Sequence, residues 1–155
     1  MGNGTISQKK MVKEISAAFK NSGFSVYIAG RGLKRQHFDN IQTAPYFDFQ
    51  KLLSQSALYI NHGGQNSVID GLIYGVPQLI CAGKVFERKY NAGSIVKIGA
   101  GLEIPYKEFT GCNIKAAVDK IISQGEYQKN AMKTGKVLLS LGGAENIIKS
   151  LEEFD

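Results

Sequence analysis

The sequence predicts an α/β fold in which a parallel sheet is flanked by helices, and three observations support this. Short apolar runs alternate with longer segments whose apolar residues recur every three or four positions, as expected when strands alternate with helices. The chain contains 18 glycines, most of them where a predicted strand is followed by a helix. Because 43% of the residues are hydrophobic, residues 1–155 are expected to form one globular domain with a sizeable core.

The amino-terminal half is predicted to contain two helices and two strands. The first helix ends at residues 21–23 and has one apolar stripe, formed by Met11, Val12, Ile15, Ala18 and Phe19. Residues 24–29 form a short apolar strand before a glycine turn, and residues 41–44 form another. The aromatic loop 45–49 leads into a short helix that contains Leu52 and Leu53.

The carboxy-terminal half continues the alternation. Residues 58–70 are predicted to form a strand, a tight glycine turn and the start of a helix that ends at Tyr74 and Gly75. Further strands are expected within residues 76–81 and 99–104, with Pro77 near the start of the first, and a polar loop at residues 82–88. The remaining helices are expected at residues 89–97, 114–122, 127–139 and 144–154.

The turn at Gly63 and Gly64 has the most informative group of neighbours. A glycine turn before a helix directs several backbone N–H groups outward at the positive end of the helix dipole, where a phosphate is the usual ligand. His62, Asn66 and Ser67 add side-chain donors beside these amides. An isolated histidine at the end of a strand would favour a purely structural role, but these neighbours favour contact with a phosphate.

Each polar cluster of interest follows a predicted strand. In parallel sheets ligands bind outside the carboxyl ends of the strands. The clusters at residues 2–5, 31, 46–49, 62–70 and 87–91 therefore indicate a nucleotide-like ligand in contact with several loops.

Some of these positions also have an ordinary structural explanation. Asp70 could accept the hydroxyls of a ribose, or it could be a surface charge. Tyr46, Phe47 and Phe49 could stack on a base, although aromatic residues more often fill a core. Glu87 and Arg88 could bind the hydroxyls of a sugar, or they could form an exposed ion pair of little energetic value.

Several other kinds of site are excluded by the residues present. The Gly-Lys pair before Val137 lacks the Ser or Thr of a Walker loop, and no G-x-G-x-x-G follows a strand. His37 and His62 have no carboxylate or cysteine spacing typical of a metal site, so no metal is expected. Ser67 has no third group that would orient His62 for nucleophilic catalysis.

Composition limits the cellular setting and the partners. The net charge is +6, but the basic residues are scattered, so no nucleic-acid surface is expected. No apolar run approaches the roughly 20 residues of a membrane helix. Cys81 and Cys112 form neither a disulfide framework nor a metal-ligand pattern. A cytoplasmic location is therefore expected.

Five segments together resemble the donor-binding domain of nucleotide-sugar glycosyltransferases of the GT-B fold. Residues 62–70 read His-Gly-Gly-Gln-Asn-Ser-Val-Ile-Asp and residues 75–77 read Gly-Val-Pro, beside the family's His-x-Gly-x-Asn-Ser-x-x-Glu and Gly-Val-Pro. In the family, these motifs are followed by an acidic residue with Gln and then by Asn-Ala, and residues 87–92 resemble that segment. Residues 2–5 resemble the first loop of the family's domain, and residues 98–101 are similar to the segment that comes after Asn-Ala. Plant secondary-product and bacterial macrolide glucosyltransferases are the most similar groups. The resemblance covers the whole chain but only the carboxy-terminal domain of those enzymes.

The resemblance implies a Rossmann-like parallel sheet that binds a UDP-hexose. Four residues would hold the diphosphate: His62, Gly64, Asn66 and Ser67. Asp70, where the family usually has Glu, would bind the ribose, Glu87 would contact the transferred sugar, and Arg88 replaces the family's Gln. The donor-binding residues implied in this way are Gly4, Thr5, Arg31, Tyr46, Phe47, His62, Gly63, Gly64, Asn66, Ser67, Asp70, Glu87, Arg88 and Asn91.

Two parts of the family's enzymes are expected to be missing. The amino-terminal domain supplies the acceptor pocket and the catalytic base, so no catalytic residue is assigned to this chain. The first strand of the carboxy-terminal domain would precede residue 2 and is central in the family's sheet, so its absence would leave a gap there. The missing domain, or a separate chain that replaces it, is the expected partner.

The leading expectation is that the chain is the donor-binding half of an inverting glycosyltransferase that moves a hexosyl group. The chain is expected to be inactive on its own. No cofactor is expected besides the UDP-sugar. The alternatives are a non-catalytic donor-binding subunit that acts with a separate acceptor chain, a protein similar to UDP-sugar 2-epimerases, and a remnant with a structural role. The epimerase reaction requires acidic and histidine residues between two domains, and this chain carries few of them.

Overall fold

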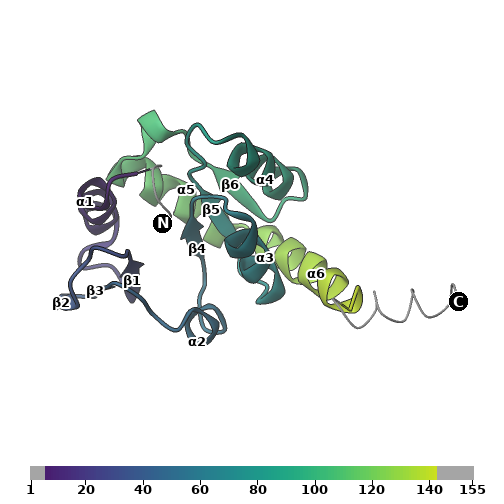
Figure 1. The fold of residues 1–155 in the computed structure, drawn as a ribbon, viewed down its shortest axis with the longest axis horizontal. Coiled ribbons are helices and arrows are strands. Elements are labelled where there is room, and N and C mark those ends of the chain that lie inside the picture. The colour runs from purple at the N-terminus through teal and green to yellow at the C-terminus, as the bar shows by residue number, and fades with distance from the viewer. Residues whose placement is uncertain (1–5, 143–155) are drawn as a thin grey trace, which may run out of the picture.

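The computed structural model describes residues 6–142, which form six α-helices, six strands and one 3-10 helix (Figure 1). The elements in chain order are α1 (Gln8–Phe19), β1 (Val26–Ala29), β2 (Gln36–Phe38), β3 (Ile41–Ala44), α2 (Phe49–Leu53), β4 (Tyr59–Asn61), α3 (Gln65–Ile73), β5 (Gln78–Ile80), α4 (Phe86–Lys97), β6 (Gly101–Glu103), η1 (Tyr106–Glu108), α5 (Gly111–Ser123) and α6 (Glu126–Ser140). Every helix and strand predicted within this range is present. The predicted helix at 144–154 and the turn at 2–5 lie outside the described residues.

The strands form two separate three-stranded sheets. The order in the first is β1-β3-β2 and in the second β4-β5-β6. Pairing is parallel between β1 and β3 and throughout the second sheet, as the alternation of strands and helices predicts. The edge strands β1 and β4 belong to different sheets and are not hydrogen-bonded to each other.

The strand β2 was not predicted. It pairs antiparallel with β3 through a hairpin whose turn residue Asp39 has φ of +52°. The neighbouring Asn40 fastens this hairpin to the end of α1, because its Nδ2 donates to the backbone oxygens of Phe19 and Phe24 at 2.8 and 2.6 Å. With a single apolar residue, Phe38, the three-residue strand has no periodicity that reveals it.

The strand β5 separates two hydrophobic clusters. Leu79 packs in the larger cluster, which includes Met11, Phe109 and Ile114, while Ile80 packs in the smaller one around α3 and α4. All three residues of β5 are buried, which explains why this segment is almost continuously apolar in the sequence. Helices α1 and α5 pack against each other, as do α3 and α6 (Figure 1).

The helix α4 begins at Phe86, three residues earlier than predicted. Its N-cap residue, Val85, makes no side-chain capping bond, and Phe86 and Tyr90 are exposed, so neither a cap nor an apolar stripe marks the start in the sequence. As a result, Glu87 and Arg88 lie in the first turn of a helix and not in a loop.

Candidate functional site

The glycine turn after β4 is held by side chains from two other elements. The backbone N–H of Gly63 donates to Oδ1 of Asn61 at 2.8 Å, and Nδ2 of Asn91 on α4 donates to the Gly63 oxygen at 2.8 Å. Gly63 has φ of +79°, and a Cβ atom there would lie 2.8 Å from the backbone oxygen of Arg88. A glycine is therefore required for both conformation and space.

The turn leads directly into the amino terminus of α3. The N-cap residue is Gly64, which has no side chain to cap the helix, so the first-turn amides receive no side-chain cap from it. Asn66 is exposed and Ser67 is half-buried in this first turn. Such a helix terminus has the backbone geometry that suits an anion, and anion binding here stays a prediction.

A buried polar network below the turn was missed in the sequence. Gln78 is fully buried in β5, where its Oε1 accepts from Nδ2 of Asn61 at 2.8 Å and its Nε2 donates to the Val68 oxygen at 2.9 Å. Gln78 thereby joins the residue that shapes the glycine turn to the first turns of α3. The detectable signal was a glutamine within an otherwise apolar strand.

Replacing Gln78 by leucine is expected to lower the free energy of unfolding by about 2 kcal/mol, because the change removes two buried hydrogen bonds and leaves the Asn61 amide unpaired. Urea titration measures the loss. The matched control Gln36→Leu, at an exposed position of β2, should stay within about 0.5 kcal/mol of wild type. Equal stability of the two variants would contradict a structural role for the network.

His62 lies half-buried at the end of β4, with its imidazole against Gly64. A Cβ atom at position 64 would lie 2.7 Å from Nε2 of His62. Burial, followed by the charge of Arg88, lowers the pKa of His62 to about 4. The imidazole is therefore neutral at pH 7 and can donate one hydrogen bond beside the helix terminus.

This lowered pKa predicts a loss of stability on mild acidification. A histidine in the unfolded chain binds its proton near pH 6.5, whereas folded His62 does so at a pKa of about 4. The contribution of His62 is fully present above about pH 6.5 and decreases as the pH falls toward 4, because the unfolded state binds the extra proton. Urea midpoints at pH 7 and pH 5 should therefore differ more for wild type than for His62→Gln. The exposed control His37→Gln should behave like wild type, and an unchanged difference in His62→Gln would contradict the prediction.

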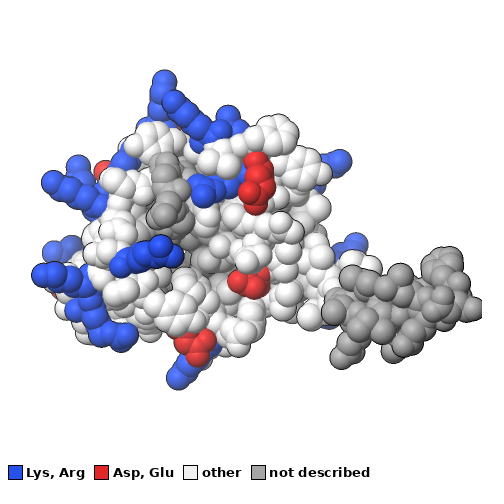
Figure 2. All heavy atoms as spheres, in the orientation of Figure 1, with Lys and Arg blue, Asp and Glu red and all other residues white. Residues whose placement is uncertain are grey.

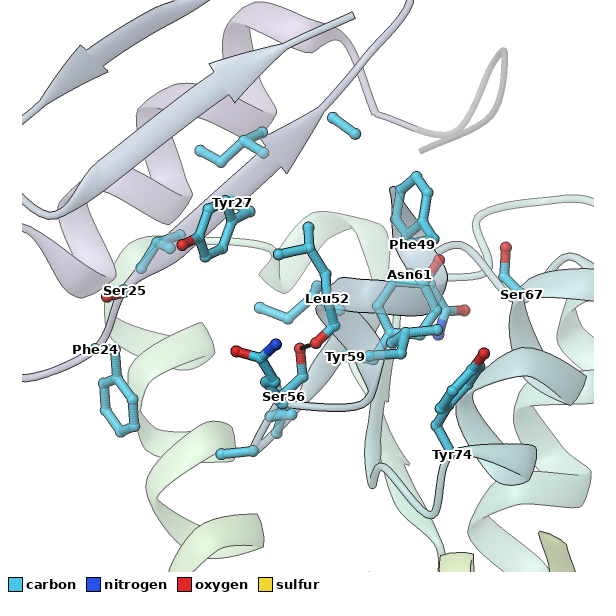
Figure 3. Close-up of a pocket in the computed structure, with 18 of the residues that line it drawn as sticks. Phe24, Ser25, Tyr27, Phe49, Leu52, Ser56, Tyr59, Asn61, Ser67 and Tyr74 are labelled. Atoms are coloured by element: carbon cyan, nitrogen blue, oxygen red, sulfur yellow. Dashed lines mark hydrogen bonds between the residues drawn. The ribbon is translucent and has the colours of Figure 1, made fainter. Parts of the chain in front are cut away.

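A cavity of about 1290 Å³ opens beside His62. Four of the predicted donor residues line it: Tyr46, His62, Ser67 and Asp70. Burial raises the pKa of Tyr59, whose side chain is hydrogen-bonded to that of Ser67 and feels the charge of Asp70. Figure 3 shows Tyr59, Asn61 and Ser67 grouped toward one end of this cavity. Asp70 is exposed there, so its carboxylate is accessible.

The aromatic loop has two different environments. The exposed ring of Tyr46 lies edge-on to Phe49 with centroids 6.2 Å apart, and Phe49 is a further 6.2 Å from Tyr59. Phe47 instead packs edge-on against Tyr27 at 5.5 Å and is not among the residues that line the cavity. Tyr46 and Phe49 therefore line the cavity, whereas Phe47 does not.

The remaining predicted residues divide into four groups. Arg88 lies close enough to influence the pKa of His62, and Asn91 donates to the Gly63 oxygen, so both lie beside the glycine turn. Glu87 is exposed in the same helical turn as Arg88. Arg31 is exposed after β1 and does not line the cavity. Gly4 and Thr5 lie outside the described residues.

Three further observations concern surface charge, metal ligands and membrane-spanning helices. Figure 2 shows lysine and arginine side chains spread around the rim of one face, with a few acidic groups nearer its middle. Residues 6–142 contain no cluster of three or more His, Cys, Asp or Glu side chains suited to a metal ion. Within the same range, every helix is too short or too polar to cross a membrane.

Comparison with known proteins identifies the family. A sequence profile of the family described as erythromycin biosynthesis protein CIII-like, C-terminal domain, matches residues 29–154. The chain belongs to this family. The NDP-glycosyltransferase YjiC of Bacillus subtilis is 26% identical over 145 residues, which cover 88% of this chain and 36% of that enzyme.

Solved glycosyltransferases share the fold. CalG4, the calicheamicin glycosyltransferase, has a TM-score of 0.87 at 18% identity and is matched over 99% of this chain and 41% of its own. The spinosyn rhamnosyltransferase SpnG complexed with thymidine diphosphate has a TM-score of 0.79 at 19% identity, over 92% of this chain and 40% of its own. These comparisons confirm the predicted family and fold, the carboxy-terminal half of a GT-B glycosyltransferase. The chain spans less than half the length of these relatives.

Proposed function

We propose that this chain binds a UDP-hexose and provides the donor-binding half of an inverting glycosyltransferase. The observation that carries the proposal is the amino terminus of α3, where first-turn amides without a side-chain cap lie beside a neutral His62. This terminus follows β4, at the carboxyl end of a parallel sheet, where α/β proteins bind nucleotides. Membership of a glycosyltransferase family supports the same ligand.

The donor would lie across the end of the second sheet. Its diphosphate would accept hydrogen bonds from the first-turn amides of α3 and from His62, while Asn66 and Ser67 add side-chain donors. The exposed carboxylate of Asp70 would accept the ribose hydroxyls. Tyr46 would contact the base.

Glu87 and Arg88 would bind the hydroxyls of the sugar from the first turn of α4. Asn91 is expected to act indirectly, since its amide is bonded to the Gly63 oxygen. The substituents that these residues recognise would decide which hexose is transferred.

The reaction requires charge stabilisation that this site would supply. In an inverting transfer the acceptor oxygen attacks the anomeric carbon on the face opposite the diphosphate, and the bond from that carbon to the β-phosphate oxygen breaks. Negative charge accumulates on the leaving UDP, where the helix terminus and His62 would stabilise it. The proton of the acceptor hydroxyl would pass to a base outside this chain, so this chain alone should bind the donor without transferring its sugar.

Calorimetric titration of the purified chain with UDP, UDP-glucose and uridine tests the proposal. UDP should bind more tightly than uridine, because the diphosphate occupies the strongest part of the site. Thymidine diphosphate, as found in the solved SpnG complex, provides the comparison for the base. Folded protein that takes up neither diphosphate would contradict donor binding altogether.

A second candidate is a donor-binding subunit that acts with a separate acceptor chain. The chain corresponds to 36% of YjiC and 41% of CalG4. Transfer activity that appears only when a separately produced acceptor domain is added would support this arrangement. The free thiols of Cys81 and Cys112 support a cytoplasmic location for either form.

A further inference from the structure

The start of α4 and the loop before it carry more positive charge than a neutral sugar requires. Residues 84–89 contain three cations and one acid, Glu87. Lys84, Glu87 and Lys89 are exposed, whereas Arg88 is half-buried. Within the part of the chain that the structure describes, neither lysine forms an ion pair. The positive charge of this segment is therefore not neutralised by acidic side chains around the two lysines.

The stability of α4 does not explain these cations. Arg88 and Lys89 lie in its first turn, at the positive end of the helix dipole, where cations are unfavourable. Lys97, in the last turn, has the favourable position. The cations at the start of the helix thus oppose its dipole, and a bound anion would compensate for them.

Arg88 is held beside the proposed diphosphate site. A Cβ atom at Gly63 would lie 2.8 Å from the backbone oxygen of Arg88, and Nδ2 of Asn91 donates to the Gly63 oxygen at 2.8 Å. The charge of Arg88 also contributes to the lowered pKa of His62, so the guanidinium lies near the imidazole. In a UDP-hexose the sugar is joined directly to the β-phosphate. A cation next to the diphosphate is therefore also next to the sugar.

The cavity separates the nucleoside from this positive segment. Tyr46, His62 and Asp70 line the cavity, but residues 84–89 do not. The base and ribose would occupy the cavity, and the diphosphate would lie at His62. The start of α4 is then left for the sugar end of the donor.

The chemistry of the segment matches a sugar that carries a carboxylate. A neutral hydroxyl gains little from a full positive charge, whereas a guanidinium forms paired, charge-assisted hydrogen bonds with a carboxylate. Lys84 and Lys89 would add longer-range attraction for the same anion. The carboxylate of Glu87 can accept hydrogen bonds from the hydroxyls. A hexuronic acid offers both groups, because its ring carries hydroxyls and its C6 is a carboxylate.

We propose that the sugar of the donor is a hexuronic acid, whose carboxylate binds Arg88 in the positive field of Lys84 and Lys89. The inference rests on the proposed function, which places a UDP-linked sugar at the start of α4. It narrows the class of that sugar from any hexose to an acidic one.

Calorimetric titration of the chain with UDP, UDP-glucose and UDP-glucuronate tests the inference. The two sugars differ only at C6, which is a hydroxymethyl group in one and a carboxylate in the other. UDP-glucuronate should bind at least about tenfold more tightly than UDP-glucose, and added salt should reduce this ratio. If UDP binds but the two sugar donors bind equally, the inference fails and the proposed function stands. If none of the three binds, the proposed function itself fails.

Three variants locate the carboxylate. Arg88→Gln should weaken binding of UDP-glucuronate at least about tenfold more than binding of UDP. Arg35→Gln is the same substitution at an exposed position before β2, in the other sheet, and should keep the preference of wild type. The double variant Lys84→Gln, Lys89→Gln changes only exposed positions and should reduce the preference about threefold.

Two results with the variants would overturn the assignment. One is an Arg88→Gln variant that still prefers UDP-glucuronate. The other is an equal loss of UDP and UDP-glucuronate in that variant, which would place the guanidinium on the diphosphate. The double lysine variant covers the case in which Arg88→Gln does not fold, because an unchanged preference there would contradict the positive field.

Discussion

Replacing His62 by alanine is expected to weaken UDP binding by about 10- to 100-fold, because a hydrogen bond to a charged partner contributes about 1.5–3 kcal/mol. The loss should fall on the diphosphate, so the affinity for uridine should change little. Calorimetry with the two ligands separates these contributions. The substitution leaves the backbone of the glycine turn intact, since Gly63 is held by Asn61 and Asn91.

The only other histidine of the chain provides the control. His37 is exposed on β2, in the sheet that does not carry the glycine turn, so His37→Ala should bind UDP as wild type does. If His62→Ala kept the affinity of wild type, His62 would not contact the ligand. If UDP and uridine lost the same factor, the imidazole would act on the nucleoside and not on the diphosphate.

The parts of the site that depend on local sequence could be predicted. A strand, a glycine turn and a helix start are each encoded within a few residues, and the end of β4, Gly63 and the start of α3 are found where the sequence predicts them. The helix terminus then follows from backbone geometry, because its amides point outward whatever the rest of the fold does.

The parts that depend on distant contacts could not be predicted. Asn61 and Gln78 lie on neighbouring strands of the sheet, but a helix separates these strands along the chain, so no local periodicity predicts that the two side chains meet. The hairpin strand β2 is stabilised by Asn40, whose side chain bonds to the end of α1. The start of α4 is likewise fixed by packing, since Asn91 is tied to Gly63 while no cap precedes the helix. In each case tertiary structure decides what local propensity leaves open.

The largest loss of stability is expected from Gly135→Ala in α6. An alanine in a helix interior is normally favoured over glycine by about 1 kcal/mol. Here a Cβ atom would lie only 1.9 Å from the backbone oxygen of Leu72 and 3.3 Å from Cα of Ile73. Neither atom belongs to a flexible side chain, so α6 and α3 must separate. We expect the free energy of unfolding to fall by about 3 kcal/mol in urea titration.

The same substitution at Gly93 should have the opposite sign. Gly93 lies in the exposed middle of α4, and a Cβ atom there would meet no heavy atom within 4 Å. Gly93→Ala should therefore gain about 0.5–1 kcal/mol from the reduced flexibility of the unfolded chain. A gain at both positions would mean that α6 does not rest on the backbone of α3. Since α3 carries the proposed donor-binding terminus, Gly135→Ala should also weaken UDP binding, whereas Gly93→Ala should leave the affinity unchanged.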